Sequence, residues 1–301
     1  MAEHNSLSLT GVFPPIPTPF NSDGDIDFDR LQSNFERWNQ QPLSGYVVGG
    51  SNGEFVSLTI KERVEMIRKS RAAIPADRLL IAGSGMESTR ATLDLTDKMA
   101  QVGADAAIVV TPSYYKNMMT ADALESHYRQ VADASAVPII LYSVPANTGI
   151  DLPVEAVIGL ADHPNVLGIK DSGGNVAKIG LMVHETPERF QVLAGSAGFM
   201  LGALAVGAVG VVAALANIAG GKLYELLEYF RAGNIPQASV IQQSLIEVNS
   251  AVTARFGVPG LKAAMDMLGF YGGPARAPLL SLTDEEKESL RQIVEKAKLN
   301  R

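Results

Sequence analysis

The 301-residue sequence contains no cysteine, and this absence removes several kinds of chemistry at once. It excludes disulfides, thiolate nucleophiles and thiolate metal sites. Histidine is almost as scarce: the chain has four, and no two of them lie within five residues of each other. A local pair of histidine ligands is therefore missing. We expect no metal and no cofactor, although the sequence leaves open a metal site assembled from distant carboxylates.

Positive charge is also in deficit, since the formal net charge is −7 at neutral pH. Nucleic acids and anionic membranes are bound by concentrated lysine and arginine, so we expect neither as a partner. A small anionic substrate is not excluded, because one or two local donors are enough to hold it.

No segment has the pattern of a signal or a membrane span. The first ten residues, MAEHNSLSLT, have neither an apolar core nor a basic run, unlike a secretory or transit peptide. The longest apolar stretch, Phe199 to Ile218, approaches the length of a membrane span. Glycines and β-branched clusters interrupt it, which favours a buried strand between turns. We therefore expect a soluble, cytoplasmic protein.

Short apolar runs, too short for helices and rich in β-branched residues, recur eight times along the chain. Each ends in Gly, Pro, Ser or Thr, which are turn signals. The runs begin at Gly11, Gly45, Arg78, Ala104, Val137, Asn165, Phe190 and Gly207.

Segments with helical spacing separate these runs. Ile60, Val64 and Ile67 share one face, and Thr59 with Glu62 forms a capping-box pattern. Buried strands that alternate with amphipathic helices indicate a parallel sheet covered by helices, and eight repeats favour a closed (β/α)₈ TIM barrel. No GxGxxG fingerprint supports a dinucleotide fold.

The barrel is expected to close near Ala214. Three further helices are predicted over 220–232, 237–254 and 284–298, the first as the eighth helix of the barrel. We thus divide the chain into a catalytic (β/α)₈ barrel, residues 1–232, and a C-terminal helical appendix, residues 233–301.

Barrel enzymes place catalysis at the carboxyl ends of their strands, and two predicted strands end in reactive groups. Lys170 follows four apolar residues at the end of the sixth strand. An ammonium ion must lose its proton before it attacks a ketone, and desolvation at an apolar barrel mouth favours the neutral form. The same run also suits a strand-end lysine that reaches back to water.

Tyr142 occupies the corresponding place at the end of the fifth strand. A phenol there can shuttle protons, although an interfacial tyrosine with a satisfied hydroxyl fits the pattern too. The turn Gly49-Gly50-Ser51-Asn52-Gly53 follows the second strand. Its backbone N–H groups, hydroxyl and amide can bind a carboxylate without arginine, but most glycine-rich turns only reverse the chain.

At these residues the chain resembles the pyruvate-dependent aldolase superfamily of dihydrodipicolinate synthase and N-acetylneuraminate lyase. The similarity covers nearly the whole chain. It is carried, in order, by PPIPTPF at Pro14, GSNGEF, TPSYY, LYSVPANTG, GIKDSGG and LAGSAG at Leu193. Within the superfamily the sequence looks most like 4-hydroxy-2-oxoglutarate aldolase, through AGSGMEST, LYSVPANTG, IKDSGG and FGVPGLK.

The resemblance implies roles for particular residues. The imine-forming lysine falls on Lys170, the proton-shuttling tyrosine on Tyr142, and the carboxylate loop on Ser51 and Asn52. The tyrosine that completes the proton relay, in many members from a neighbouring subunit, falls on Tyr114. The family pattern also implies a homotetramer built as a dimer of dimers.

Three further positions are candidates for substrate binding: Asn147, Ser172 and Gly195, the last within LAGSAG. Dihydrodipicolinate synthases carry an arginine, which grips the second substrate's carboxylate, where this chain has Asn147. Losing such a clamp is not a conservative change. Ser172 replaces an alanine common in the synthases, and it can hydrogen-bond the substrate or merely form a turn.

The predicted function is a metal-free, Schiff-base aldolase that cleaves 4-hydroxy-2-oxoglutarate to pyruvate and glyoxylate. Lys170 forms the imine, while Tyr142, relayed through Ser51 and Tyr114, removes the hydroxyl proton. The alternative is another pyruvate-dependent lyase or synthase of the superfamily, acting on 2-keto-3-deoxy sugar acids or making 4-hydroxy-tetrahydrodipicolinate. Two further hypotheses are a keto-acid sensor without turnover and a metal-dependent aldolase.

Overall fold

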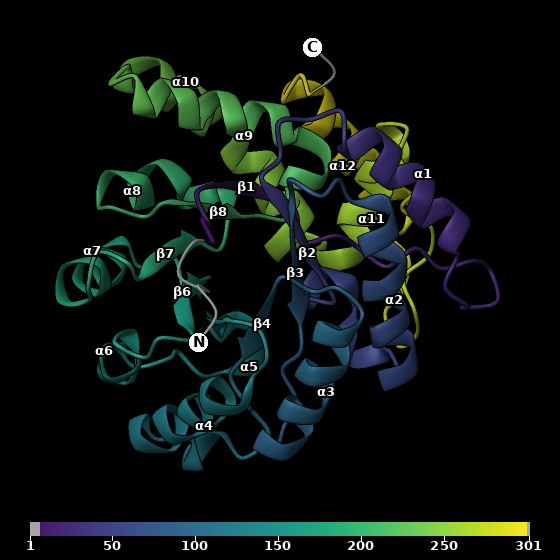
Figure 1. Ribbon diagram of the computed structural model, residues 1–301. Helices are drawn as coiled ribbons and strands as arrows, with labels where there is room; N and C mark the ends of the chain where they lie inside the picture. Colours follow the sequence, from purple (N-terminus) through teal and green to yellow (C-terminus); the bar gives the residue numbers. More distant parts are fainter. Residues whose placement is uncertain (1–6, 300–301) are drawn as a thin grey trace.

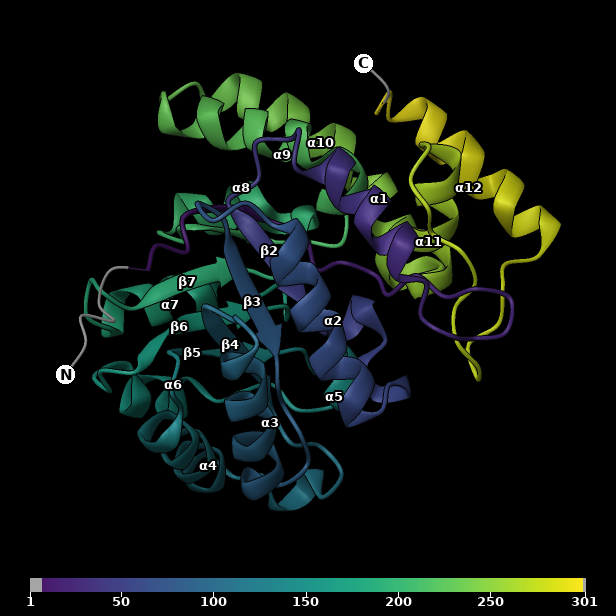
Figure 2. The same ribbon diagram turned by 45° about the vertical axis from the view of Figure 1, so that its right-hand side comes forward.

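The computed structural model describes residues 7–299 and shows a barrel of strands surrounded by helices (Figures 1 and 2). Residues 1–6, on which much of the expectation about the amino terminus rests, lie outside the described residues. The strands are β1 (Gly11–Phe13), β2 (Gly45–Val48), β3 (Leu79–Gly83), β4 (Ala106–Val110), β5 (Ile139–Ser143), β6 (Val166–Asp171), β7 (Gln191–Ala194) and β8 (Gly210–Val212).

The eight strands are parallel and follow the order β1-β8-β7-β6-β5-β4-β3-β2. An isolated parallel bridge between Pro15 and Val47 joins β1 to β2 and nearly closes the ring. There the Ile16 N–H donates to the Val47 carbonyl at 3.0 Å. The predicted TIM barrel is thus confirmed, and β8 ends just before the expected closing point at Ala214.

Most of the helices follow the strands and cover the barrel (Figure 1). They are α1 (Phe28–Trp38), α2 (Ile60–Ala73), α3 (Thr89–Gln101), α4 (Ala121–Ala134), α5 (Pro145–Thr148), α6 (Val154–Ala161), α7 (Val176–Glu185), α8 (Met200–Ala205) and α9 (Ala216–Arg231). The predicted capping box is present at the start of α2: the Thr59 hydroxyl accepts from the Glu62 backbone, and the Glu62 carboxylate accepts from the Thr59 backbone.

The C-terminal region contains one more helix than the sequence pattern predicts. Helix α10 (Ile235–Ser250) continues as a π-helical turn (Ala251–Arg255), and α12 (Asp284–Lys296) is the last helix of the described residues. Between them lies α11 (Gly257–Met267), which has glycine and proline in its first turn. Those residues weaken the helical pattern and conceal this element.

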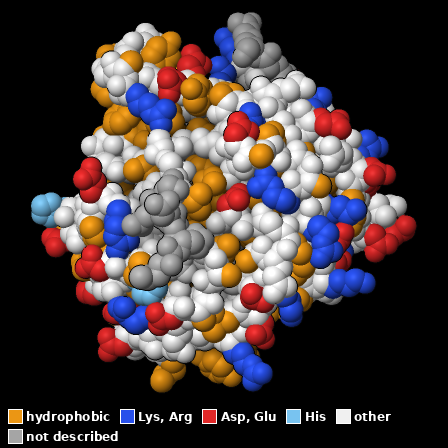
Figure 3. Space-filling view, viewed as in Figure 1, with side chains coloured by type: hydrophobic (Ala, Val, Ile, Leu, Met, Phe, Trp, Pro, Cys, Tyr) orange, Lys and Arg blue, Asp and Glu red, His pale blue; other side chains and the backbone are white. Residues whose placement is uncertain are grey.

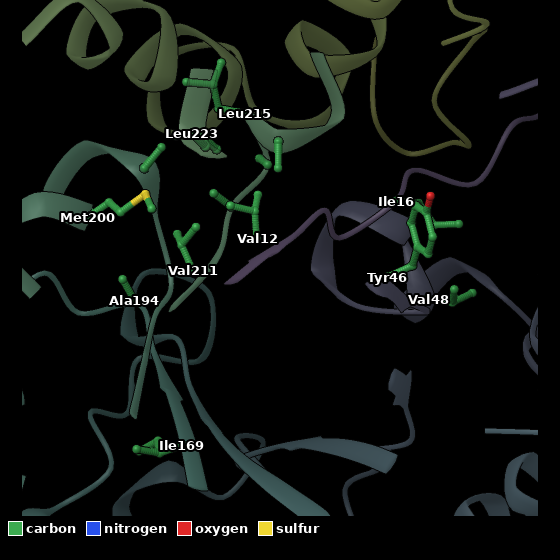
Figure 4. Close-up of a cluster of buried hydrophobic side chains, with 14 of the residues drawn as sticks. Val12, Ile16, Tyr46, Val48, Ile169, Ala194, Met200, Val211, Leu215 and Leu223 are labelled. Carbon is green, nitrogen blue, oxygen red and sulfur yellow. The ribbon is translucent and has the colours of Figure 1, made fainter. Parts of the chain in front are cut away.

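The apolar core forms two layers because the strands are buried on both faces. On β5, Ile139 and Leu141 belong to the outer layer beneath the helices, whereas Ile140 and Tyr142 belong to the barrel interior. Figure 4 shows part of the outer layer, which includes Val12, Val211, Leu215 and Leu223. The two-residue period of a strand therefore directs the Tyr142 ring into the barrel.

The surface seen in Figure 3 carries lysine and arginine interspersed with aspartate and glutamate. Among residues 7–299, no helix is long and apolar enough to cross a bilayer. The apolar stretch from Phe199 is divided among α8, β8 and the start of α9. In the same range, no group of three or more histidines and carboxylates is arranged to hold a metal ion.

Candidate active site

Lys170 and Tyr142 are direct partners in the register between β5 and β6. The Lys170 ammonium nitrogen lies 4.0 Å from the centroid of the Tyr142 ring. Both side chains are buried, with Lys170 only 4% exposed. The lysine therefore does not reach back to bulk water, which was the alternative reading of its strand-end position.

The Tyr142 phenol lies in a polar environment. Its hydroxyl is 3.3 Å from the Ser51 hydroxyl. Burial by itself raises the pKa of Tyr142, but the charge of Lys170 and hydrogen bonds from Ser51, Lys170 and Ser172 outweigh it and hold that pKa below its ordinary value. A phenol with a lowered pKa is better matched to proton transfer near neutral pH.

The turn after β2 brings Ser51 and Asn52 to the same end of the barrel. Residues Ser51–Gly53 form one turn of 3₁₀ helix, and Gly49 before it has a φ of 75°. That left-handed conformation is readily available to glycine, so Gly49 lets the chain leave β2 and turn over the barrel mouth. The turn thus presents its polar side chains beside Tyr142.

A cavity of about 330 Å³ lies at this end of the barrel. Of the eight predicted site residues it is lined by seven: Ser51, Asn52, Tyr142, Asn147, Lys170, Ser172 and Gly195. They come from the loops or ends of β2, β5, β6 and β7. The structure therefore brings together residues separated by up to 144 positions (195 − 51) in the sequence.

Gly195 is required by close packing against the end of β6. A β-carbon added at this position would lie 2.0 Å from the Ser172 hydroxyl oxygen and 2.6 Å from the Asp171 carbonyl oxygen. The Gly195 N–H also donates to that carbonyl at 2.7 Å. The absence of a side chain at Gly195 therefore allows the end of β7 to pack this closely against Ser172 at the cavity wall.

An ion pair behind the cavity supports the turn that carries Ser172. Asp171 is fully buried, and one of its oxygens lies 3.1 Å from the Lys178 ammonium. Its other oxygen accepts the Gly173 N–H at 2.8 Å. Lys178 also pairs with Asp151. These contacts fix the backbone on either side of Ser172.

Tyr114 is the one predicted residue that the structure does not bring to this cavity. Its side chain is 78% exposed and contacts Tyr115 edge to face, with ring centroids 5.1 Å apart. The Glu87 carboxylate holds this loop by accepting the backbone N–H groups of Ser113 and Tyr114, each at 2.9 Å. Within its own chain, Tyr114 is not among the residues that line the cavity of Lys170, and its role stays a prediction.

The C-terminal region supplies cavity residues that the sequence pattern did not indicate. Thr253 and Ala254 of the π-helical turn, with Gly257 and Val258 of α11, line the cavity. π-helical turns recur at functional sites because they redirect side chains within a helix. The motif FGVPGLK was visible as a likeness, but nothing in its residue types indicated that it faces the barrel mouth.

A larger neighbouring cavity of about 490 Å³ shares Ser51, Val144 and Asn147 with the first. It contains Arg63 and Glu87 but neither Lys170 nor Tyr142. Reactive groups, rather than volume, identify a catalytic site, so we assign the candidate site to the smaller cavity.

The fold and the cavity define a (β/α)₈ barrel protein with an amine and a phenol paired at the carboxyl ends of adjacent strands. Comparison with known proteins gives the family. The sequence model of the dihydrodipicolinate synthetase family matches residues 8–297, and the chain belongs to this family. It is accordingly an enzyme of the carbon–carbon lyase and synthase type.

Two kinds of relative illustrate the similarity. A 4-hydroxy-tetrahydrodipicolinate synthase of Methanoculleus marisnigri is 35% identical over 287 residues, covering 94% of this chain and 98% of its own. The crystal structure of a dihydrodipicolinate synthase from Bacillus anthracis has a TM-score of 0.92 at 31% identity and covers 96% of this chain and 98% of its own. The chloride-inhibited enzyme from Acinetobacter baumannii, complexed with pyruvate, has a TM-score of 0.92 at 29% identity, over 97% of this chain and all of its own.

Proposed function

We propose that the chain is a pyruvate-dependent lyase or synthase that forms a Schiff base through Lys170. One observation carries this proposal: a buried lysine lies 4.0 Å from the ring of a tyrosine whose hydroxyl contacts Ser51. An amine in such a place can condense with a ketone, and a phenol beside it can move the protons that the reaction requires. The pyruvate complex of the Acinetobacter baumannii relative supports the choice of ketone.

In this scheme the turn at Ser51 and Asn52 binds the carboxylate of the 2-keto acid. The neutral Lys170 amine attacks C2, and the resulting carbinolamine loses water to give a protonated imine. In cleavage that cation accepts the electron pair released when the C3–C4 bond breaks; the enamine so formed is protonated at C3, and water hydrolyses the imine to release pyruvate and the Lys170 amine. In condensation the pyruvate imine loses a proton from C3 to give the same enamine, which attacks the aldehyde. Tyr142, in contact with Ser51, takes the C4 hydroxyl proton in cleavage and returns it in condensation.

The second reactant distinguishes two candidate reactions. The names of the relatives favour condensation of pyruvate with a semialdehyde, as in 4-hydroxy-tetrahydrodipicolinate synthase. The lining of the cavity lacks the arginine clamp expected of the synthases, and on this ground we propose cleavage of 4-hydroxy-2-oxoglutarate to pyruvate and glyoxylate, with Ser172 as a donor to the distal carboxylate. Asn147 occupies the place of the expected carboxylate clamp, and no arginine is among the residues that line the cavity. The proposed similarity in activity to 4-hydroxy-2-oxoglutarate aldolase rests on Asn147 in this cavity and on the sequence motifs.

Borohydride reduction in the presence of pyruvate tests the Schiff base. We expect a stable covalent adduct on Lys170, located by peptide mass spectrometry, and complete loss of the adduct in Lys170→Ala. Lys98→Ala is the matched control, because this exposed lysine in the last turn of α3 does not line the cavity, and the adduct on Lys170 should persist in it. Modification elsewhere, or no modification of Lys170, would contradict the proposal.

Direct assays then separate the two reactions. Glyoxylate release from 4-hydroxy-2-oxoglutarate and pyruvate consumption with the semialdehyde are measured on one preparation, with and without a chelator. Cleavage at least about tenfold more efficient than condensation, a difference of about 1.4 kcal/mol in transition-state binding, supports the aldolase. The reverse ratio supports the synthase. Activity lost with the chelator would contradict the metal-free scheme, and absence of any turnover would favour a keto-acid sensor.

A further inference from the structure

The residue that follows the carboxylate-binding turn has an unusual backbone conformation. Glu54 has φ 55° and ψ 35°, in the left-handed region. In residues 7–299 only one other non-glycine residue, Lys298 near the chain end, has a positive φ. Such a conformation persists where surrounding contacts impose it. The contacts of Glu54 therefore bear on the turn that presents Ser51 and Asn52.

Those contacts come from the C-terminal region. One Glu54 oxygen lies 2.6 Å from the ammonium of Lys262 on α11, and both side chains are only 1% exposed. The other oxygen accepts the backbone N–H of Arg276 at 2.8 Å. Lys262 also donates to the Pro274 carbonyl at 2.7 Å and lies 4.5 Å from the centroid of the Phe20 ring. Both charged groups of the pair therefore make their contacts with other parts of the protein rather than with solvent.

A buried ion pair of this kind is weak evidence for stability. Desolvation of two charges offsets much of their attraction, and an apolar pair of similar volume is often as stable. Burial lowers the pKa of Lys262 and Glu54 opposes this, which shows both effects acting on one group. A directional pair does one thing that an apolar pair does not: it fixes the orientation of the groups it joins.

The turn is held from a second side as well. The Thr18 hydroxyl, fully buried, donates to the Gly53 carbonyl at 2.6 Å. Helix α11, which carries Lys262, also contributes Gly257 and Val258 to the cavity wall. Helix α11 therefore lines the cavity and, through Lys262, also holds the turn that carries Ser51 and Asn52.

We propose that Glu54 and Lys262 are positioning residues, which hold the turn in the conformation that lets Ser51 and Asn52 bind the substrate carboxylate. The inference rests on the proposed function, because it takes that turn to be the carboxylate site. Neutralising either partner releases the turn without touching the amine of Lys170. Affinity for the keto acid falls, while the capacity to form the imine at saturating keto acid remains.

The test compares Glu54→Gln, Lys262→Met and the double variant with the wild type. Pyruvate affinity is measured by calorimetric titration, which reports binding whether or not an imine forms. Borohydride trapping at saturating pyruvate then reports the competence of Lys170. We expect each single variant to bind pyruvate about tenfold or more weakly, with trapping still complete. Glu54→Gln keeps the side-chain length and an acceptor oxygen, so it remains informative if Lys262→Met does not fold.

Arg71→Met provides a control that separates positioning from general destabilisation. Arg71 pairs with Asp105 at 3.0 Å, and neither residue lines the cavity. This variant should lose thermal stability with unchanged pyruvate affinity. The double variant, free of an unpaired buried charge, should regain stability relative to Lys262→Met but not regain affinity.

The outcomes are distinct. Pyruvate affinity within about twofold of the wild type in both single variants would overturn the positioning role. Wild-type affinity in the double variant, together with weakened affinity in the single variants, would also overturn it, because the loss would then come from the unpaired buried charge. A wild type that binds pyruvate but gives no adduct on Lys170 would overturn the proposed function alone. A wild type that binds no pyruvate would overturn both.

Discussion

Lys170 illustrates how little a residue's sequence position fixes by itself. A lysine at the end of an apolar run suits both a buried nucleophile and a solvated strand end. The structure separates the two, because the side chain is 4% exposed and lies against the Tyr142 ring. The interpretation as a buried nucleophile depends on contact with Tyr142, which belongs to another strand. Sequence spacing does not show contacts between strands.

Tyr142→Phe tests the proton-transfer role at the scale of one residue. We expect kcat to fall about 100-fold or more, since a positioned general acid or base typically contributes that much. Equilibrium trapping of pyruvate on Lys170 should persist, because the amine remains. Steady-state kinetics combined with borohydride trapping measures both quantities.

Tyr128→Phe is the matched control for this variant. Tyr128 is also fully buried, and its hydroxyl donates to the Val109 carbonyl at 3.0 Å. Loss of that hydroxyl should cost stability but leave kcat nearly unchanged. Equal losses of kcat in the two variants would indicate a packing effect rather than proton transfer.

At the scale of elements, helix α2 is joined to the C-terminal segment by one carboxylate. Glu62 completes the capping box of α2 and also pairs with Arg276, whose guanidinium donates to both carboxylate oxygens at 2.7 and 3.1 Å. The hydrogen bonds from Arg276 lower the pKa of Glu62 from 4.5 to about 2, and those from Thr59 act in the same direction. The capping pattern was readable in the sequence, whereas the partner 214 residues away was not.

This shift predicts a pH-dependent contribution to stability. The folded-state pKa is depressed, so the contribution is fully present above the ordinary value of 4.5 and is lost as the pH falls towards about 2. Glu62 is partly exposed, so solvent screening reduces the effect. We expect Glu62→Gln to lower the free energy of unfolding by about 1 kcal/mol at pH 7.

Urea unfolding between pH 7 and pH 3 measures this difference. The gap between Glu62→Gln and the wild type should narrow steadily as the pH falls below 4.5. Glu65→Gln, on the same helix and paired with exposed Arg68 and Lys69, should cost less than about 0.5 kcal/mol. A gap that stays constant over the whole range would count against the carboxylate charge as its source.

At the scale of the whole molecule, Tyr114 bears on the oligomeric state. The residue is exposed on a loop fixed by Glu87, beside the exposed Tyr115 and Met118. Exposed aromatic side chains held in place are common where proteins associate. These observations support the proposal that this loop meets a neighbouring subunit in a homotetramer, built as a dimer of dimers, and that Tyr114 completes a site there.

Subunit mixing tests that arrangement. We expect Lys170→Ala and Tyr114→Phe each to be inactive or weak alone, because under this proposal each removes a different part of the site. If Tyr114 acts across an interface, mixed dimers contain one complete site, and random mixing should restore about a quarter of wild-type activity.

Refolding the two variants together and assaying the mixture measures this recovery. The same mixture of Lys170→Ala with Tyr142→Phe is the control, because both side chains belong to one chain's cavity. That control should show no recovery in its mixed dimers. Failure of the Tyr114→Phe mixture to gain activity, despite mixed oligomers shown by mass spectrometry, would place Tyr114 outside the neighbour's site.

The sequence alone determined the barrel and the strand ends from which the cavity is built. Eight apolar runs with turn signals fix eight buried strands, and parallel strands of a barrel present their carboxyl ends at one mouth. The sequence therefore places Lys170, Tyr142 and Ser51 at the same end of the barrel.

Only the tertiary structure decided what surrounds those residues. The α11 segment, whose glycines and proline conceal its helix, returns across the barrel mouth to line the cavity and pair Lys262 with Glu54. The burial of Lys170 and the direction of Tyr114 likewise depend on packing among distant segments. Local periodicity is set by neighbours along the chain, whereas burial and ion pairing depend on neighbours in space, and these are fixed only when the chain is folded.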